Sequence, residues 1–123
     1  MAYLTVFYTI DLELLEGGLT YPELKSAATR VGHCSHYLAV DPRFAKLLDT
    51  GHPIPGATHP FVVPHYLLPH ELPAVQRTLE ELLEEVGLVE VGDGGWVTEQ
   101  LSGFLNACAV CIQSQQAMLV LLA

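Results

Sequence analysis

The chain ends in the run Ala117-Met118-Leu119-Val120-Leu121-Leu122-Ala123, its longest uninterrupted apolar stretch. These seven residues are too few for a buried helix, and far fewer than the roughly twenty that a membrane span requires. The run is therefore predicted to be a strand that is covered on both faces, in the middle of a sheet. We expect the rest of the fold to be arranged around this strand.

A second strand is predicted at the other end of the chain, over residues 2–10. There Leu4, Val6, Tyr8 and Ile10 alternate with Tyr3, Thr5, Phe7 and Thr9, all residue types that favour strands. Both faces carry large side chains, which again predicts a central position. The chain is expected to be α+β, with a single mixed or antiparallel sheet whose N- and C-terminal strands are central.

Two main helices are predicted to pack on this sheet, over about 71–86 and 98–115. The first has a stripe of apolar residues from Leu72 to Val86 and is expected to end at Gly87. The second is expected to begin at a Thr98 cap and to bury Cys108 and Cys111.

The remaining elements are predicted to be short. One or two short helices are expected, over residues 20–31 and 42–48. An edge strand is predicted at residues 61–63, inside the proline-rich stretch 51–73. A hairpin is predicted to join residues 88–91 to residues 96–97 through a glycine-rich turn.

Composition limits the class of protein. The 123 residues suit one domain; 50% are hydrophobic and 15% are charged, which excludes intrinsic disorder. The net charge of −9 has the wrong sign for a nucleic-acid partner. No membrane span or secretory leader pattern is present, so a cytoplasmic location with reduced cysteines is expected. A sheet that is apolar on both faces needs helices on both sides or a second chain, as in a homodimer.

The second half of the chain carries most of this charge. Residues 62–123 hold eight acidic and one basic residue, whereas residues 1–61 hold six acidic and four basic residues. Four of the acids, Glu80, Glu81, Glu84 and Glu85, share one face of the predicted first main helix. This acidic face is interpreted either as a solvated surface or as a docking surface for a basic protein.

Six histidines lie within the region 33–70, together with Cys34. Imidazole and thiolate are ligands that zinc prefers, so a zinc site or a metal-dependent hydrolase is the alternative function. The candidate ligands are His33, Cys34, His36, His52 and His59. Their spacing matches no known ligand pattern. The other interpretation is that these histidines bind no cofactor and are ordinary polar residues at turns.

The segment Pro64-His65-Tyr66-Leu67-Leu68-Pro69-His70-Glu71-Leu72 resembles the helix start of the YfbM-like family, small bacterial α+β domains of unknown function. The opening strand over residues 3–11 and the closing helix–strand unit are also similar, although Leu68 stands where that family commonly has a Ser or Thr cap. The resemblance implies a cytosolic domain without established enzymology, some of whose relatives look like immunity proteins. The leading interpretation is therefore a non-enzymatic protein-binding module.

Overall fold

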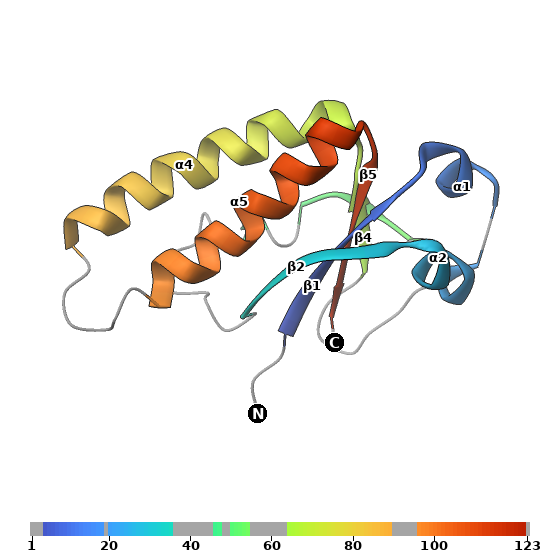
Figure 1. Cartoon of the computed structure of the whole chain (residues 1–123), viewed down its shortest axis with the longest axis horizontal. Coiled ribbons are helices and arrows are strands. Elements are labelled where there is room, and N and C mark those ends of the chain that lie inside the picture. The colour runs from blue at the N-terminus through green and yellow to red at the C-terminus, as the bar shows by residue number, and fades with distance from the viewer. Residues whose placement is uncertain are drawn as a thin grey trace.

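The computed structural model describes residues 4–18, 20–35, 46–47, 50–54, 64–89 and 96–122. Its strands form one antiparallel five-stranded sheet in the order β2-β1-β5-β4-β3 (Figure 1). The strands are β1 (Leu4–Ile10), β2 (Thr29–Ser35), β3 (His52–Pro53), β4 (His65–Leu67) and β5 (Ala117–Leu122). The helices are α1 (Leu12–Glu16), α2 (Tyr21–Ala27), α4 (Leu72–Val89) and α5 (Trp96–Ser114), with a 3-10 turn at Pro69–Glu71. The predicted α+β class is confirmed.

Strand β5 lies in the middle of the sheet, as its apolar sequence predicts. Met118 and Val120 belong to one buried cluster, and Leu119 and Leu121 belong to a second cluster on the opposite face. Strand β1 pairs with β5 on one side and with β2 on the other. The prediction that the two terminal strands are central is therefore confirmed.

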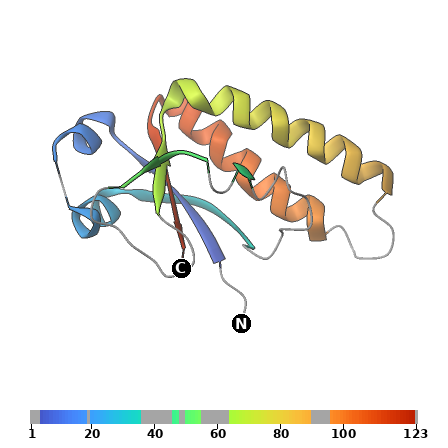
Figure 2. The same cartoon turned by 180° about the vertical axis from the view of Figure 1, so that it is seen from behind.

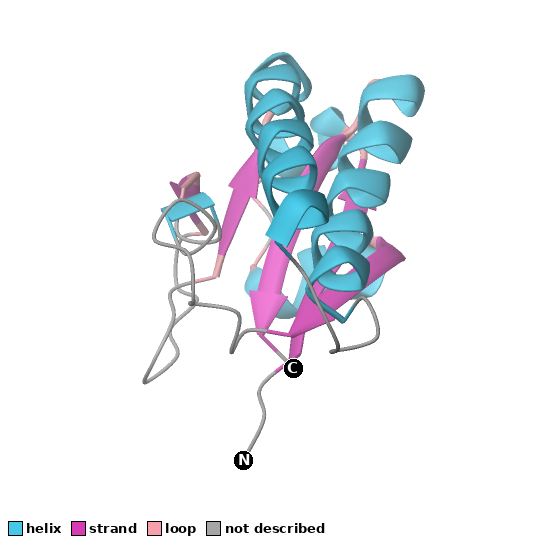
Figure 3. Ribbon diagram, turned by 90° about the vertical axis from the view of Figure 1, so that its left-hand side faces the viewer, coloured by secondary structure: helices cyan, strands magenta, loops and turns pink. Residues whose placement is uncertain are grey.

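The two faces of the sheet are covered by different helices. Helices α4 and α5 lie side by side over one face, as Figures 2 and 3 show, and their apolar residues form the larger cluster. On the other face, Leu24 of α2 and Leu12 and Leu15 of α1 pack in the smaller cluster. Among the described helices, none is long and apolar enough to cross a bilayer.

Because helices cover both faces of the sheet, no second chain is needed to bury its apolar side chains. Among the described residues, the large hydrophobic side chains left exposed are Leu14 and Val110. The homodimer stays a prediction, but the apolar sheet faces no longer require it.

The junction between α5 and β5 is a tight helix-ending motif. Gln115 adopts the left-handed conformation with φ 56°, and its N–H donates to the Ile112 carbonyl at 3.2 Å. The Gln116 N–H donates to the Cys111 carbonyl at 3.0 Å, which completes a Schellman motif. The Gln116 side chain also donates to Asp11 at 2.8 Å and contacts Thr9. These bonds fix the start of β5 against the end of β1.

Three predicted boundaries are wrong. The short helix predicted over residues 20–31 ends at Ala27, and Val31 lies in β2, because pairing with β1 overrides the helical spacing. Helix α4 continues through Gly87 to Val89, since a glycine without positive φ only weakens a helix. The hairpin is therefore excluded: residues 88–89 are helical, and α5 already begins at Trp96, before Thr98.

Several smaller predictions fall outside the described residues. These are the edge strand at residues 61–63, the glycine-rich turn at residues 92–95 and most of the helix at residues 42–48. Of that helix, residues 46–47 are described and are helical. Strands β3 and β4, within the proline-rich stretch, are elements that the sequence did not predict.

Candidate functional site

Helix α5 approaches β2 unusually closely because both elements have a glycine at the crossing. A Cβ atom built on Gly103 would lie 2.5 Å from the His33 carbonyl oxygen, and one built on Gly32 would lie 3.2 Å from the Gly103 carbonyl oxygen. A β-bulge at Val31 interrupts the register of β2 with β1 next to this contact. The helix is thus held directly against the edge strand of the sheet.

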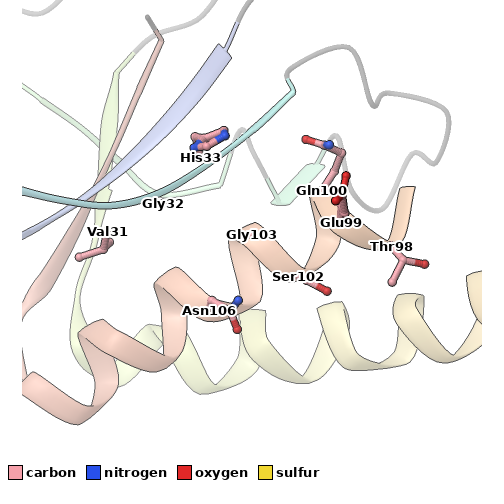
Figure 4. A pocket seen from close by; sticks show the side chains of 9 residues that line it. All are labelled: Val31, Gly32, His33, Thr98, Glu99, Gln100, Ser102, Gly103 and Asn106. Carbon is pink, nitrogen blue, oxygen red and sulfur yellow. The ribbon is translucent and has the colours of Figure 1, made fainter. Parts of the chain in front are cut away.

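A groove of about 460 Å³ opens beside this contact. It is lined by residues 31–33 of β2 and by side chains of α5 between Thr98 and Asn106 (Figure 4). Ser102 and Asn106 supply a hydroxyl and an amide, and among the described residues of the lining Glu99 is the one carboxylate. The His33 ring projects on the side of β2 away from α5 (Figure 4). Its Nδ1 atom lies 3.2 Å from the Nη2 atom of Arg30.

The four glutamates proposed for partner binding, Glu80, Glu81, Glu84 and Glu85, are all exposed on α4. At about 100° per residue they span an arc of roughly 140°, opposite the buried Leu79 and Leu82. Figure 1 shows the C-terminal half of α4 beside the N-terminal half of α5. The exposed carboxylate of Glu99, in the first turn of α5, therefore lies at the same end of the helix layer.

The candidate zinc ligands do not come together in the part of the chain that the structure describes. His33 is exposed and Cys34 is fully buried, because successive residues of a strand point to opposite faces. Within the described residues, no group of three His, Cys, Asp or Glu side chains is placed to hold a metal ion. His36 and His59 lie outside those residues. The pair His33 and Cys34 is therefore excluded as two ligands of one ion.

His52 lies against the carboxylate of Glu71, whereas the zinc alternative requires it to bind a metal ion. Its Nε2 atom lies 2.9 and 3.1 Å from the two carboxylate oxygens of Glu71, and its ring stacks on Tyr66 with a centroid distance of 5.1 Å. Glu71 also accepts a hydrogen bond from the Leu68 N–H at 2.8 Å. Glu71 thus caps the helix start that lacks a polar residue at Leu68, and it ties β3 to that helix.

Burial acts to raise the pKa of Glu71, but the Leu68 hydrogen bond and the hydrogen bond and charge of His52 outweigh it, with a further contribution from His70. The pKa of Glu71 therefore lies below its ordinary value. Because folding lowers this pKa, the contribution of Glu71 to stability is complete above the ordinary pKa of a glutamate. It is lost as the pH falls through the lowered pKa of the folded state.

Replacing Glu71 with alanine is expected to lower the free energy of unfolding by about 1 kcal/mol at neutral pH, the usual effect of losing a helix cap. The difference from the unmodified chain should shrink on acidification, as measured by urea denaturation at decreasing pH. Glu71→Gln keeps a hydrogen-bond acceptor without the charge and serves as the control. A difference that does not change with pH would contradict the assigned role of the carboxylate.

The three cysteines are free and buried in the larger cluster. Burial raises the pKa of the Cys34 thiol to about 12, and burial together with the neighbouring Cys111 raises that of Cys108 to about 12. Burial also raises the pKa of Cys111, partly offset by a hydrogen bond from Thr9. These thiols stay protonated at neutral pH, which does not suit a nucleophile or a redox pair. The prediction that Cys108 and Cys111 are core residues is confirmed.

Sequence reasoning missed the groove entirely. Its signal was present in Gly32 and Gly103, since an isolated glycine inside a strand or helix often marks the close approach of another backbone. The two glycines are 71 positions apart (103 minus 32), so the sequence does not reveal that they meet at the same contact between helix and strand.

The fold and these surfaces define an α+β protein with a two-helix layer, a polar groove at one sheet edge and an acidic outer helix face. No protein family matches this chain, and no curated protein or solved structure matches it.

Proposed function

We propose that this protein is a non-enzymatic binding module that captures a basic protein through the acidic face of α4, defined as Glu80, Glu81, Glu84 and Glu85. The observation that carries the proposal is the exposure of all four carboxylates on one arc of the outer helix. A resemblance to the YfbM-like family, with immunity-like relatives, fits a protein of this kind and is part of the proposal.

The arrangement of the glutamates favours docking over simple solubility. Glu80 with Glu84, and Glu81 with Glu85, are like-charge pairs four residues apart, and each such pair costs an isolated helix about 0.2–0.5 kcal/mol. Arg77, which precedes Glu81 by four residues, offsets part of this cost. A surface required only for solubility has no need of such repulsion, whereas a basic partner relieves it on binding.

Changing the four glutamates together to glutamine is expected to slow association with a basic partner by about ten- to a hundredfold at low salt. The partner is first isolated on the tagged protein from its host at low ionic strength. Its association rate is then measured by stopped-flow fluorescence as a function of salt. The quadruple variant should also lose most of the salt dependence, because the charges that steer the partner are gone.

A matched control removes three exposed acids at the other end of the molecule, Glu13 and Glu16 of α1 and Glu23 of α2. This triple glutamine variant should slow association much less, since its charges lie far from the acidic face. Equal slowing by both variants would mean that only net charge matters, and no slowing by the quadruple variant would rule out the acidic face.

A further inference from the structure

Residues 50–54, which include β3, run as a strap along the sheet edge opposite β2. The strap pairs with β4 over two residues, and the Ile54 N–H donates to the Pro64 carbonyl at 3.1 Å. Pro53 has no N–H and donates no backbone hydrogen bond. Because so short a pairing is marginal by itself, the strap depends on side-chain contacts to stay on β4.

One end of the strap has a glycine hinge. Gly51 has a φ of 145°, a backbone conformation that other residues rarely adopt. A Cβ atom built on Gly51 would lie 2.5 Å from Cδ2 of the His65 ring and 2.9 Å from the Tyr66 carbonyl oxygen. The chain therefore turns onto β4 at a position that only glycine fits. Since glycine also reaches other backbone angles at low cost, rotation at Gly51 is sufficient to swing the strap off β4.

The other end of the strap is held by burial. Ile54 is 2% exposed and packs in the smaller apolar cluster, on the sheet face that α1 and α2 cover. Lifting the strap exposes this side chain to water, which costs free energy at every pH. The open strap is therefore a minor state of the folded protein.

Between these two ends, the pair His52 and Glu71 joins the strap to the start of α4, and we call this pair the latch. The His52 Nε2 atom lies within hydrogen-bond distance of both carboxylate oxygens of Glu71, and the His52 ring stacks on Tyr66. The carboxylate is already held in place by the Leu68 N–H, which does not belong to the strap. Opening the strap thus breaks the His52 contact and leaves the helix cap in place.

The charges around the latch are few. His52 on the strap and His70 in the 3-10 turn are the groups whose charges act on Glu71, while residues 72–76 of α4 and the part of α5 after Glu99 contain no charged residue. Burial acts to raise the pKa of Glu71, but the hydrogen bonds from Leu68 and His52 and the charges of both histidines hold it below its ordinary value. The part of this lowering that comes from His52 exists only while the strap is closed.

We propose that the strap is an acid-sensitive device: it swings off β4 while the rest of the sheet stays folded, and the Glu71 carboxylate controls how often it does so. Opening leaves β4 as the edge strand and removes the ring that stacks on Tyr66. The contribution of the latch is complete above the ordinary pKa of a glutamate and is lost as the pH falls through the lowered pKa of Glu71. The proposal goes beyond the proposed function, because it concerns this sheet edge and not the acidic face of α4.

Native-state hydrogen exchange of the full 15N-labelled chain tests the proposal. The Ile54 amide reports opening of the strap, and the amides of β5, in the middle of the sheet, report global unfolding. At neutral pH, the opening constant from Ile54 should exceed that from β5 by at least about tenfold. Below about pH 4.3, the ordinary pKa of a glutamate, it should rise by about threefold to tenfold in all. The rise should never exceed about tenfold per pH unit, because a single proton is taken up.

Variants of the latch assign this effect to the two side chains. Glu71→Gln removes the charge but keeps an acceptor for the helix cap, and it should raise the opening constant about threefold to tenfold at neutral pH, with no further rise in acid. His52→Phe keeps a ring to stack on Tyr66 without the nitrogen and should have the same effect. Glu16→Gln removes an exposed carboxylate from α1 as the control and should leave the Ile54 amide unchanged.

A variant of the hinge tests the geometry independently of charge. Gly51→Ala forces the strap away from β4 and should raise the opening constant at least about tenfold at all pH values. Gly18→Ala is the matched control, since Gly18 also has a positive φ, 73°, but has open space around its Cβ position. This control strains the chain far from the strap and should not change opening at Ile54 relative to β5.

Three results would overturn the proposal. The first is an Ile54 opening constant equal to that of β5 in the unmodified chain, because the strap would then open only when the whole protein unfolds. The second is faster opening in Glu71→Gln but not in His52→Phe, which would assign the carboxylate to the helix cap alone. The third is an opening constant at Ile54 that does not change between neutral pH and the acid range.

Discussion

Replacing Gly103 with alanine is expected to destabilise the protein by about 2 kcal/mol, although the same change stabilises most helices by nearly 1 kcal/mol. The added Cβ would lie 2.5 Å from the carbonyl oxygen of His33, which is backbone and has no flexible end to move aside. Helix α5 must therefore shift away from β2. Urea denaturation followed by circular dichroism measures the loss as a lower midpoint with an unchanged slope.

The exposed Ala109 on the same helix provides the baseline for this prediction. Ala109→Gly should cost about 1 kcal/mol from helix propensity alone. If Gly103→Ala instead stabilises the chain by a similar amount, the close contact between α5 and β2 is absent in solution. The groove beside that contact would then lose its structural basis.

Replacing Phe104 with alanine is expected to lower the free energy of unfolding by about 3–5 kcal/mol, a large fraction of the 5–15 kcal/mol that stabilises a typical domain. Phe104 is fully buried, and its ring lies 4.5 Å from the ring of Phe7, measured between centroids. The loss has two parts. The variant no longer gains the free energy of burying the ring, and a cavity is left between α5 and β1. Thermal and urea unfolding both report it.

A double-mutant cycle separates the ring contact from general burial. Phe7→Leu and Phe104→Leu, alone and together, should show a coupling of about 0.5–1.5 kcal/mol. Val110→Ala is the control on the same helix, because Val110 is 42% exposed and its truncation should change stability by no more than about 0.5 kcal/mol. Additive effects of the two leucine substitutions would contradict the contact between the rings.

The elements that the sequence predicts well are those whose side-chain pattern is unambiguous. β5 is apolar on both faces, and α4 separates Leu79 and Leu82 from its glutamates, so each reveals its type without reference to the rest of the chain. Strand β2 was missed because it contains Gly32, a residue that is depleted in strands, and because its pairing partner β1 lies far away in sequence. The hairpin prediction is wrong because Gly87 keeps a helical conformation inside α4 and does not adopt the left-handed conformation that ends a helix.

The candidate sites also differ in how far the sequence predicts them. The acidic face could be predicted because four exposed glutamates on one helix follow from periodicity alone. The fate of the histidines could not be predicted, since adjacency in sequence made His33 and Cys34 look like a ligand pair, whereas strand alternation sends them to opposite faces. His52 meets Glu71 only because β3 pairs with β4 beside the start of α4.

The sequence by itself determined the α+β class, the central position of the terminal strands and the acidic outer face of α4, because each depends on the local spacing of apolar and charged residues. Only the tertiary structure decided that α5 packs on β2 through Gly32 and Gly103, and that a groove opens beside them. The physical reason is that such contacts join backbone segments far apart in the chain, and no local pattern records which glycine will face which.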